Sequence, residues 1–187
     1  MEPVTMYING SCKGNPGPGG WAAIVVYKDK ERTIEGNALS TTNNQMELKA
    51  VIEGLKLLKH KPCHVSVVTN STYPVMTKEK YERLSAKADW PNKELWAELV
   101  HVCNKYKHHV SYKTENSETD SEKTKRCDKF AKREAELANS MLDTAILPGK
   151  SCRELIEKFM LEERRENFEK RIRKRKEVLN DEFSYCE

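Results

Sequence analysis

The start of the chain alternates between apolar and polar side chains in the pattern of β-strands. Residues 4–9 keep a strict period of two, which indicates a strand with one buried face. Residues 21–27 predict a second strand and residues 33–38 a third, with the polar segment KDKE between them as a hairpin turn. The chain is therefore expected to open with three strands that follow one another closely.

After residue 42 the period changes to that of a helix. Glu47, Val51, Leu55 and Leu58 fall on one helical stripe. We expect this helix to end near residue 60, because Pro62 cannot continue it. A charged residue, Glu47, therefore shares a face with three apolar ones.

Strands and helices continue to alternate up to residue 145. Residues 64–69 form a nearly continuous apolar run, as expected for a strand that is covered on both faces. Further along we expect a short helix after Asn70, a helix at 92–107, a strand at 109–114 and a helix to about Met141 that opens with the capping box Thr119-x-x-Glu122. This order predicts an α/β fold with one mixed sheet and helices on its faces.

The chain divides into a domain at 1–145 and an extension at 146–187. The segment ILPG at 146–149 breaks the helical pattern, and the capping box Ser151-x-x-Glu154 then opens a highly charged helix of about 30 residues. Its apolar stripe is thin and consists of Leu161, Phe168, Ile172 and Leu179. Such a helix needs a surface to lie on, which favours a docking role for residues 150–187.

Charge and composition indicate a polar chain that does not enter a membrane. Charged residues make up 33% of it, and the net charge of +4 is small, although the basic residues are clustered. No apolar run has the length of a membrane span, and the first residues lack the pattern of a signal peptide. The six scattered cysteines favour reduced thiols. We expect a cytoplasmic protein, and a nuclear or organellar location stays open.

Two carboxylates lie where the helical pattern places apolar residues. Glu47 lies on the stripe described above, and Asp128 shares a stripe with three alanines. A charge on an apolar face is costly unless it is paired or binds a metal ion. Asn9 and Asn70 stand at the ends of predicted strands. Together these four residues predict one polar cluster.

Several motifs then resemble one family, type I ribonuclease H, in the order in which that family has them. The resemblance covers residues 5–73 and 92–140, and it rests on the segments YINGSCKGNPGPGGWAAIV, TTNNQMELKAVIEGL, VTNSTY, NKELW and RCDKFAKREA. It implies the RNase H-like fold: a mixed five-stranded sheet of three antiparallel strands followed by two parallel ones, flanked by helices. Here the charged helical extension follows that fold.

The resemblance also implies a chemistry, and the chain departs from it. Enzymes of this family cut the RNA strand of an RNA/DNA hybrid with two Mg²⁺ ions held by four carboxylates. Those four catalytic positions correspond to Asn9, Glu47, Asn70 and Asp128, of which only Glu47 and Asp128 are acids. The family's mobile histidine falls at Glu118. Since Mg²⁺ prefers anionic oxygen ligands, we expect weak or absent metal binding at Glu47 and Asp128 and no cleavage.

Three functions remain open on these grounds. The first is a natural pseudo-nuclease that still binds RNA/DNA hybrid or structured RNA. The second is an endoribonuclease acting on RNA/DNA hybrids that was deliberately disarmed at Asn9 and Asn70. The third is a scaffold subunit of a nucleoprotein complex that holds a protein partner through residues 150–187. The absence of the histidine favours natural loss over deliberate disarming.

The resemblance further implies nucleic-acid contacts from loop backbone and small polar side chains. The matching positions are Gly10, Ser11, Cys12, Asn15, Asn43, Asn44, Gln45 and Asn92. Turn chemistry at Asn15 and a helix N-cap at Asn43 are alternative explanations. In the extension, the segment KRIRKRK offers a phosphate-binding or nuclear-import element through Lys170, Arg171, Arg173, Lys174 and Arg175.

Overall fold

A five-stranded sheet forms the centre of the computed structural model, which describes residues 2–75, 81, 83, 90–115 and 121–145. The strands lie in the order β3-β2-β1-β4-β5. Their bounds are β1 Glu2–Cys12, β2 Gly17–Tyr27, β3 Lys30–Thr41, β4 Cys63–Thr69 and β5 His109–Thr114. Strands β1, β2 and β3 pair antiparallel, whereas β4 and β5 run parallel to β1. The predicted mixed sheet is confirmed.

The first two strands are longer than their side-chain pattern predicted. Their ladder continues through the glycine-rich segment, where Gly10 pairs with Trp21 and Cys12 with Gly19. Glycine has no side chain to place on either face, so the period of two disappears from the sequence although the backbone pairing continues.

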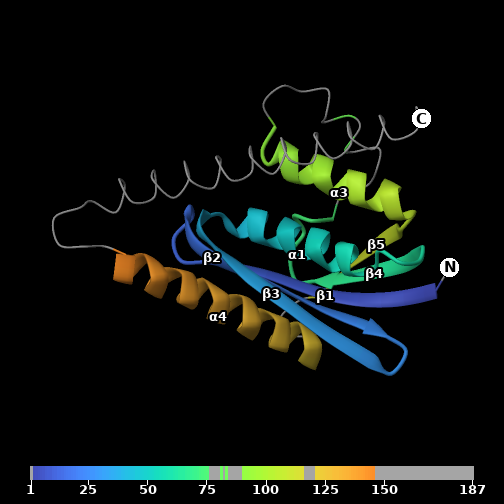
Figure 1. Cartoon of the computed structure of the whole chain (residues 1–187), viewed down its shortest axis with the longest axis horizontal. Helices are drawn as coiled ribbons and strands as arrows, with labels where there is room; N and C mark the ends of the chain where they lie inside the picture. The colour runs from blue at the N-terminus through green and yellow to red at the C-terminus, as the bar shows by residue number, and fades with distance from the viewer. Residues whose placement is uncertain (1, 76–80, 82, 84–89, 116–120, 146–187) are drawn as a thin grey trace, which may run out of the picture. The chain divides into compact units, whose positions relative to one another are not determined.

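Among the helices within the described ranges, α1 (Asn43–Leu57) and α3 (Lys93–Tyr106) lie on one face of the sheet, and α4 (Glu122–Ala145) lies on the other (Figure 1). The main core lies under α1 and α3, and its fully buried members include Met6, Ile8, Leu48, Ile52, Val67 and Trp96. Burial of such side chains contributes about 1.5–3 kcal/mol each, so this face supplies most of the hydrophobic stabilisation.

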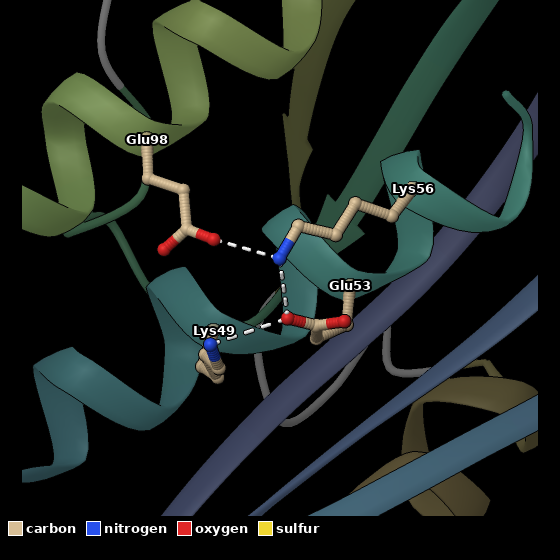
Figure 2. Close-up of polar contacts among 4 residues, drawn as sticks. All are labelled: Lys49, Glu53, Lys56 and Glu98. Carbon is tan, nitrogen blue, oxygen red and sulfur yellow. Dashed lines mark hydrogen bonds and ion pairs between the residues drawn. The ribbon is translucent and has the colours of Figure 1, made fainter. Parts of the chain in front are cut away.

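A chain of charged side chains joins α1 to α3 (Figure 2). Lys56 Nζ lies 2.7 Å from Glu98 Oε1 on α3 and 2.9 Å from Glu53 Oε1 on α1, and Lys49 Nζ lies 3.2 Å from Glu53 Oε1. Burial alone would raise the pKa of Glu53, but the lysines outweigh it and the pKa is lowered. Half-exposed pairs of this kind stabilise weakly, so their main effect is to orient the two helices.

On the opposite face, α4 approaches the sheet through small residues. Cys127 and Ala131 pack on Ala22 and Ile24 of β2. A Cβ atom at Gly20 would collide with the α4 backbone at Ala131, so only glycine permits this approach. Ion pairs to β3 complete the contact, from Lys123 and Arg126 to Glu31 and from Arg133 to Glu35.

Several predicted features fall outside the described residues. These are Glu118, Thr119 and the whole extension at 146–187 with its basic run. Residues 71–75 form a bend and a turn, Tyr81 and Arg83 are helical, and the rest of the segment in which a short helix was expected lies outside the described residues. Within the described ranges, no helix is long and apolar enough to cross a membrane.

Candidate active site

Asn9 lies inside the central strand and is almost completely buried. The residue is 4% exposed, and its backbone pairs with Ala22 of β2. Ile8 belongs to the core under α1, so Asn9 faces the side of α4. Among the described residues, Asn9 Nδ2 has no hydrogen-bond acceptor. A buried donor without a partner costs about 1–3 kcal/mol, so the amide is poorly suited to this place.

Glu47 enters the site from the first turns of α1. Glu47 is 5% exposed, and its Oε2 accepts a hydrogen bond of 2.7 Å from Ser71 Oγ. Burial raises the pKa of Glu47, and the hydrogen bond from Ser71 opposes that rise. The helix start is fixed by a capping box between Thr42 and Gln45, which holds Glu47 in position.

Gly10 brings β1 into direct contact with α1 at this point. A Cβ atom placed on Gly10 would lie 2.6 Å from the backbone nitrogen of Glu47 and 2.9 Å from Cβ of Met46. Any other residue would push the strand and the helix apart. The glycine therefore positions Asn9, its neighbour in the chain, close to the start of α1.

Asn70 follows the last residue of β4 and is exposed. The turn after it is held by hydrogen bonds from the backbone nitrogen of Ser71 to Thr69 Oγ1 (3.1 Å) and from that of Tyr73 to Ser71 Oγ (3.1 Å). Strands β1 and β4 pair in parallel up to Tyr7 and Val68. Continuing this register by two residues places Asn9 and Asn70 at the same end of the sheet.

Asp128 comes from α4 and differs from its predicted environment. Cys127 shares the stripe of alanines and is fully buried. The Asp128 side chain, in contrast, is 34% exposed and forms an ion pair with Lys132 at 2.7 Å. Positions 127 and 128 both stand at helical spacing from the alanines, so the sequence pattern did not distinguish them. The expectation of a carboxylate on an apolar face was wrong for Asp128 and right for Glu47.

Cys127 anchors this part of α4 to the strands next to Asn9. Its thiol donates hydrogen bonds to the carbonyl oxygens of Ala22 (3.2 Å) and Tyr7 (3.4 Å). Burial raises the pKa of the thiol to about 12, so it stays protonated and can donate. The structure thus brings the four predicted positions to one end of the sheet, through the contacts of Gly10, Ser71 and Cys127.

The donor set fits a pair of Mg²⁺ ions poorly. Two carboxylates remain, and Ser71 and Lys132 already engage one oxygen of each. The other two positions supply amides, which carry no charge and present an N–H₂ group as well as an oxygen. Within the described ranges, no group of three or more His, Cys, Asp or Glu residues is arranged to hold a metal ion.

Several of the predicted nucleic-acid contacts are engaged in the structure of the domain itself. Gln45 Oε1 accepts from the Thr42 nitrogen (3.1 Å) and from Thr41 Oγ1 (2.9 Å), so Gln45 closes the capping box. The N-cap of α1 is Thr42, and the alternative that placed it at Asn43 was wrong. Asn15 Oδ1 accepts from the Asn43 nitrogen (3.3 Å), which ties the glycine-rich loop to α1.

The remaining candidate residues differ in whether their side chains are hydrogen-bonded within the domain or exposed to solvent. Cys12 donates to the carbonyl oxygens of Gly17 and Thr41 at 3.3 Å, and Asn92 donates to the Tyr73 hydroxyl at 2.7 Å. Asn43 and Asn44 are exposed at the helix start, and Ser11 is half-buried. The exposed pair therefore keeps side chains available for a ligand beside Glu47.

Two residues that shape the site were not predicted from the sequence. Ser71, the partner of Glu47, follows Asn70 in the turn, and Lys132 stands four residues after Asp128. The spacing of Lys132 is a recognisable signal for a helical ion pair. The hydrogen bond of Ser71 depends on where β4 ends relative to α1, which the sequence pattern does not report.

A hollow of about 660 Å³ lies over α4 beside Asp128. Its lining is predominantly basic and consists of Arg126, Asp128, Lys129, Phe130, Lys132, Arg133 and Glu136. Cationic side chains around an open surface are typical of phosphate contacts.

Comparison with known proteins assigns the fold and the family. The sequence profile of the RNase H family matches residues 1–136. Ribonuclease H of Thermoanaerobacter sp. (strain X514) is 40% identical over 140 residues, covering 70% of this chain and 88% of the relative. Ribonuclease HI of Helicobacter pylori (strain J99 / ATCC 700824) is 40% identical over 149 residues, covering 73% of this chain and 95% of the relative.

Solved structures agree with this assignment. LC9-RNase H1, described as a type 1 RNase H with the type 2 active-site motif, matches with a TM-score of 0.64 and 27% identity over 73% of this chain and 74% of its own. LC11-RNase H1, solved in complex with RNA/DNA hybrid, shares the fold with a TM-score of 0.60 at 22% identity over 73% of this chain and 99% of its own. On the family profile, the curated relatives and the sheet topology together, the chain belongs to the ribonuclease H family.

Proposed function

We propose that this RNase H-like protein binds RNA/DNA hybrid or structured RNA without hydrolysing it. The binding site is the end of the sheet where Asn9, Glu47, Asn70 and Asp128 lie. The observation that carries this proposal is Asn9. It replaces a carboxylate at the most buried of the four positions, and its amide nitrogen has no acceptor among the described residues.

Electrostatics disfavours hydrolysis at this site. Two divalent ions bring four positive charges, whereas the side chains at the four positions supply two negative ones. Mg²⁺ gives up its waters reluctantly and prefers anionic oxygen ligands in near-octahedral geometry. Water screens little at a buried position, so the charge missing at Asn9 is not replaced by solvent.

Two features support retained binding of nucleic acid. Arg126, Lys129 and Lys132 are part of the basic lining beside Asp128, where a phosphate backbone would gain counterion release. Asn43 and Asn44 remain exposed at the start of α1 and could contact 2′-hydroxyl groups. Binding is then expected to fall steeply with salt and to need no Mg²⁺.

The names of the relatives favour a second function, an active endoribonuclease that cuts the RNA strand of a hybrid. Curated proteins at 40% identity are named ribonuclease H and ribonuclease HI. This alternative requires metal binding by the present donor set, or by residues outside the described ranges.

Cleavage of an end-labelled RNA/DNA hybrid in Mg²⁺ or Mn²⁺ distinguishes the two. We expect no cleavage by the parent protein, and cleavage by the double variant Asn9→Asp, Asn70→Asp if the surrounding site is intact. Cleavage by the parent that is lost in Glu47→Gln would establish the active nuclease instead. If neither the parent nor the double variant cuts, loss of function extends beyond the two amides, and binding alone remains.

Binding is measured separately, with fluorescent hybrid and duplex RNA in EDTA across a range of salt concentrations. The proposal is supported by tight binding at low salt, with an association constant whose logarithm falls linearly with the logarithm of the salt concentration. Failure to bind hybrid or duplex RNA at low salt would overturn it. A chain that ends at residue 149 is the matched comparison, because loss of the basic run at 170–176 is expected to make the salt dependence less steep.

A further inference from the structure

Two histidines lie side by side at the end of the sheet opposite the candidate active site. His64 is the second residue of β4 and His109 is the first of β5, and the two are register partners in the parallel ladder. Their ring centroids are 5.2 Å apart, with the ring planes tilted by 35°. Two imidazoles separated by 45 residues in the chain are thus neighbours on one surface.

Both rings are open to solvent on the face turned away from α1 and α3. Val65 and Val110, the next residues in each strand, belong to the core on the other face, so the histidines point outward. Within the described part of the chain, neither imidazole makes a hydrogen bond or an ion pair, and each has the other ring as its recorded neighbour. Their nitrogen atoms are therefore available to a ligand.

The spacing of the rings suits a shared metal ion. Zinc binds imidazole nitrogen at about 2.0–2.1 Å, and two imidazoles on one tetrahedral ion have ring centres roughly 5 Å apart. The observed 5.2 Å agrees with that value. Imidazole nitrogen is a preferred ligand of Zn²⁺, Ni²⁺ and Cu²⁺, and a poor one for Mg²⁺.

We infer that His64 and His109 form a surface site for a divalent transition-metal ion, with water in the remaining coordination positions. The bound ion joins β4 to β5, which is one of the two edge strands of the sheet. Since an edge strand is paired on one side alone, a metal ion that bridges β4 and β5 adds a second link between β5 and the sheet.

This site is independent of the proposed function. His64 lies five residues before Thr69 at the other end of β4, which corresponds to roughly 16 Å along the strand. An ion there does not reach Glu47 or Asp128. Loss of the histidine site therefore leaves nucleic-acid binding unchanged, and the two inferences can fail separately.

The test is calorimetric titration of the full, untagged chain with Ni²⁺ under reducing conditions, at about pH 8, where protons compete little for imidazole. We expect one Ni²⁺ per chain, with affinity at least tenfold lower in His64→Asn and in His109→Asn. The matched control is His101→Asn, because His101 is an exposed histidine on α3 and its removal is expected to leave the affinity unchanged.

A second readout links the ion to the pair rather than to one histidine. In nitrogen-15 spectra of the imidazoles, Zn²⁺ is expected to shift the signals of both rings together, and hydrogen exchange of the β5 amides is expected to slow. Saturable binding that survives in the double variant His64→Asn, His109→Asn would overturn the inference. So would an affinity that falls in one single variant and not in the other, or the absence of saturable binding by the parent.

Discussion

The candidate active site has a buried half and an exposed half. Asn9 and Glu47 are 4% and 5% exposed, and they lie where β1 meets the start of α1. Asn70 stands in the open after β4, and Asp128 is 34% exposed with a lysine beside it. Each half has kept one carboxylate and holds one amide.

The difference shows that equal substitutions have unequal consequences. In the exposed half, water and neighbouring cations can compensate for the gain or loss of a charge, as Lys132 does for Asp128. In the buried half, the protein itself must supply every interaction, because little solvent reaches the group. The amide at Asn9 therefore decides more about this site than the amide at Asn70.

The largest effect on stability is expected from restoring the buried charge. Asn9→Asp places a carboxylate at a position that is 4% exposed and should lower the free energy of unfolding by ~3 kcal/mol, since an unpaired buried charge costs several kcal/mol. Asn70→Asp should change it by less than ~0.5 kcal/mol, as exposed substitutions usually do. Urea unfolding with and without Mg²⁺ measures the free energy of unfolding of both variants. Mg²⁺ should restore part of the stability that Asn9→Asp loses. Equal losses in the two variants would contradict the distinction between the halves.

The close contact of β1 with α1 predicts the next largest effect. Gly10→Ala should destabilise the protein by ~2 kcal/mol, because the added Cβ atom meets the Glu47 nitrogen at 2.6 Å and forces strand and helix apart. Ser11→Ala, one residue further along, serves as the matched control and should stay within ~0.5 kcal/mol. Thermal unfolding of both variants tests this, and an unaffected Gly10→Ala would show that the approach of β1 to α1 is looser than described.

A pH dependence is expected from the buried carboxyl of Glu47. Its pKa is raised in the folded protein by burial, so between its ordinary value near 4.5 and the raised value the folded state binds more protons than the unfolded state. The contribution of Glu47 therefore lowers stability as pH rises through this window. Glu47→Gln removes that contribution and can still accept a hydrogen bond from Ser71. Urea unfolding from pH 4 to 8 should show a flatter profile in the variant, and identical profiles would argue against a raised pKa.

The smallest effect is expected at the exposed ion pair. Lys132→Gln and Asp128→Asn should each change the free energy of unfolding by less than ~0.5 kcal/mol, because the pair is solvated and lies within one helix turn. A change above ~1 kcal/mol in either variant would show that Asp128 is engaged more tightly than its exposure suggests.

Regular elements were the part of the fold that the side-chain pattern predicted well. The helix from residue 43, the strand at 64–69 and the mixed sheet are all present, because periods of two and of 3.6 arise from burial of one face. The missed portion of β2 is the glycine-rich segment Gly17–Gly20, which pairs with the missed end of β1 from Gly10 onwards, and there backbone pairing leaves no trace in side-chain character.

The family, the α/β order of the elements, and the amides at two of the four positions that the resemblance assigns to catalytic carboxylates can all be recognised from the sequence, because they depend on residue identity and local period. Three further features become visible only in the folded chain: Cys127 is buried and Asp128 is not, Gln45 caps a helix, and Ser71 donates a hydrogen bond to Glu47. The fold also places His64 beside His109. These facts depend on strand register and on how closely helices approach the sheet, and both are set by packing between segments that are distant in the chain.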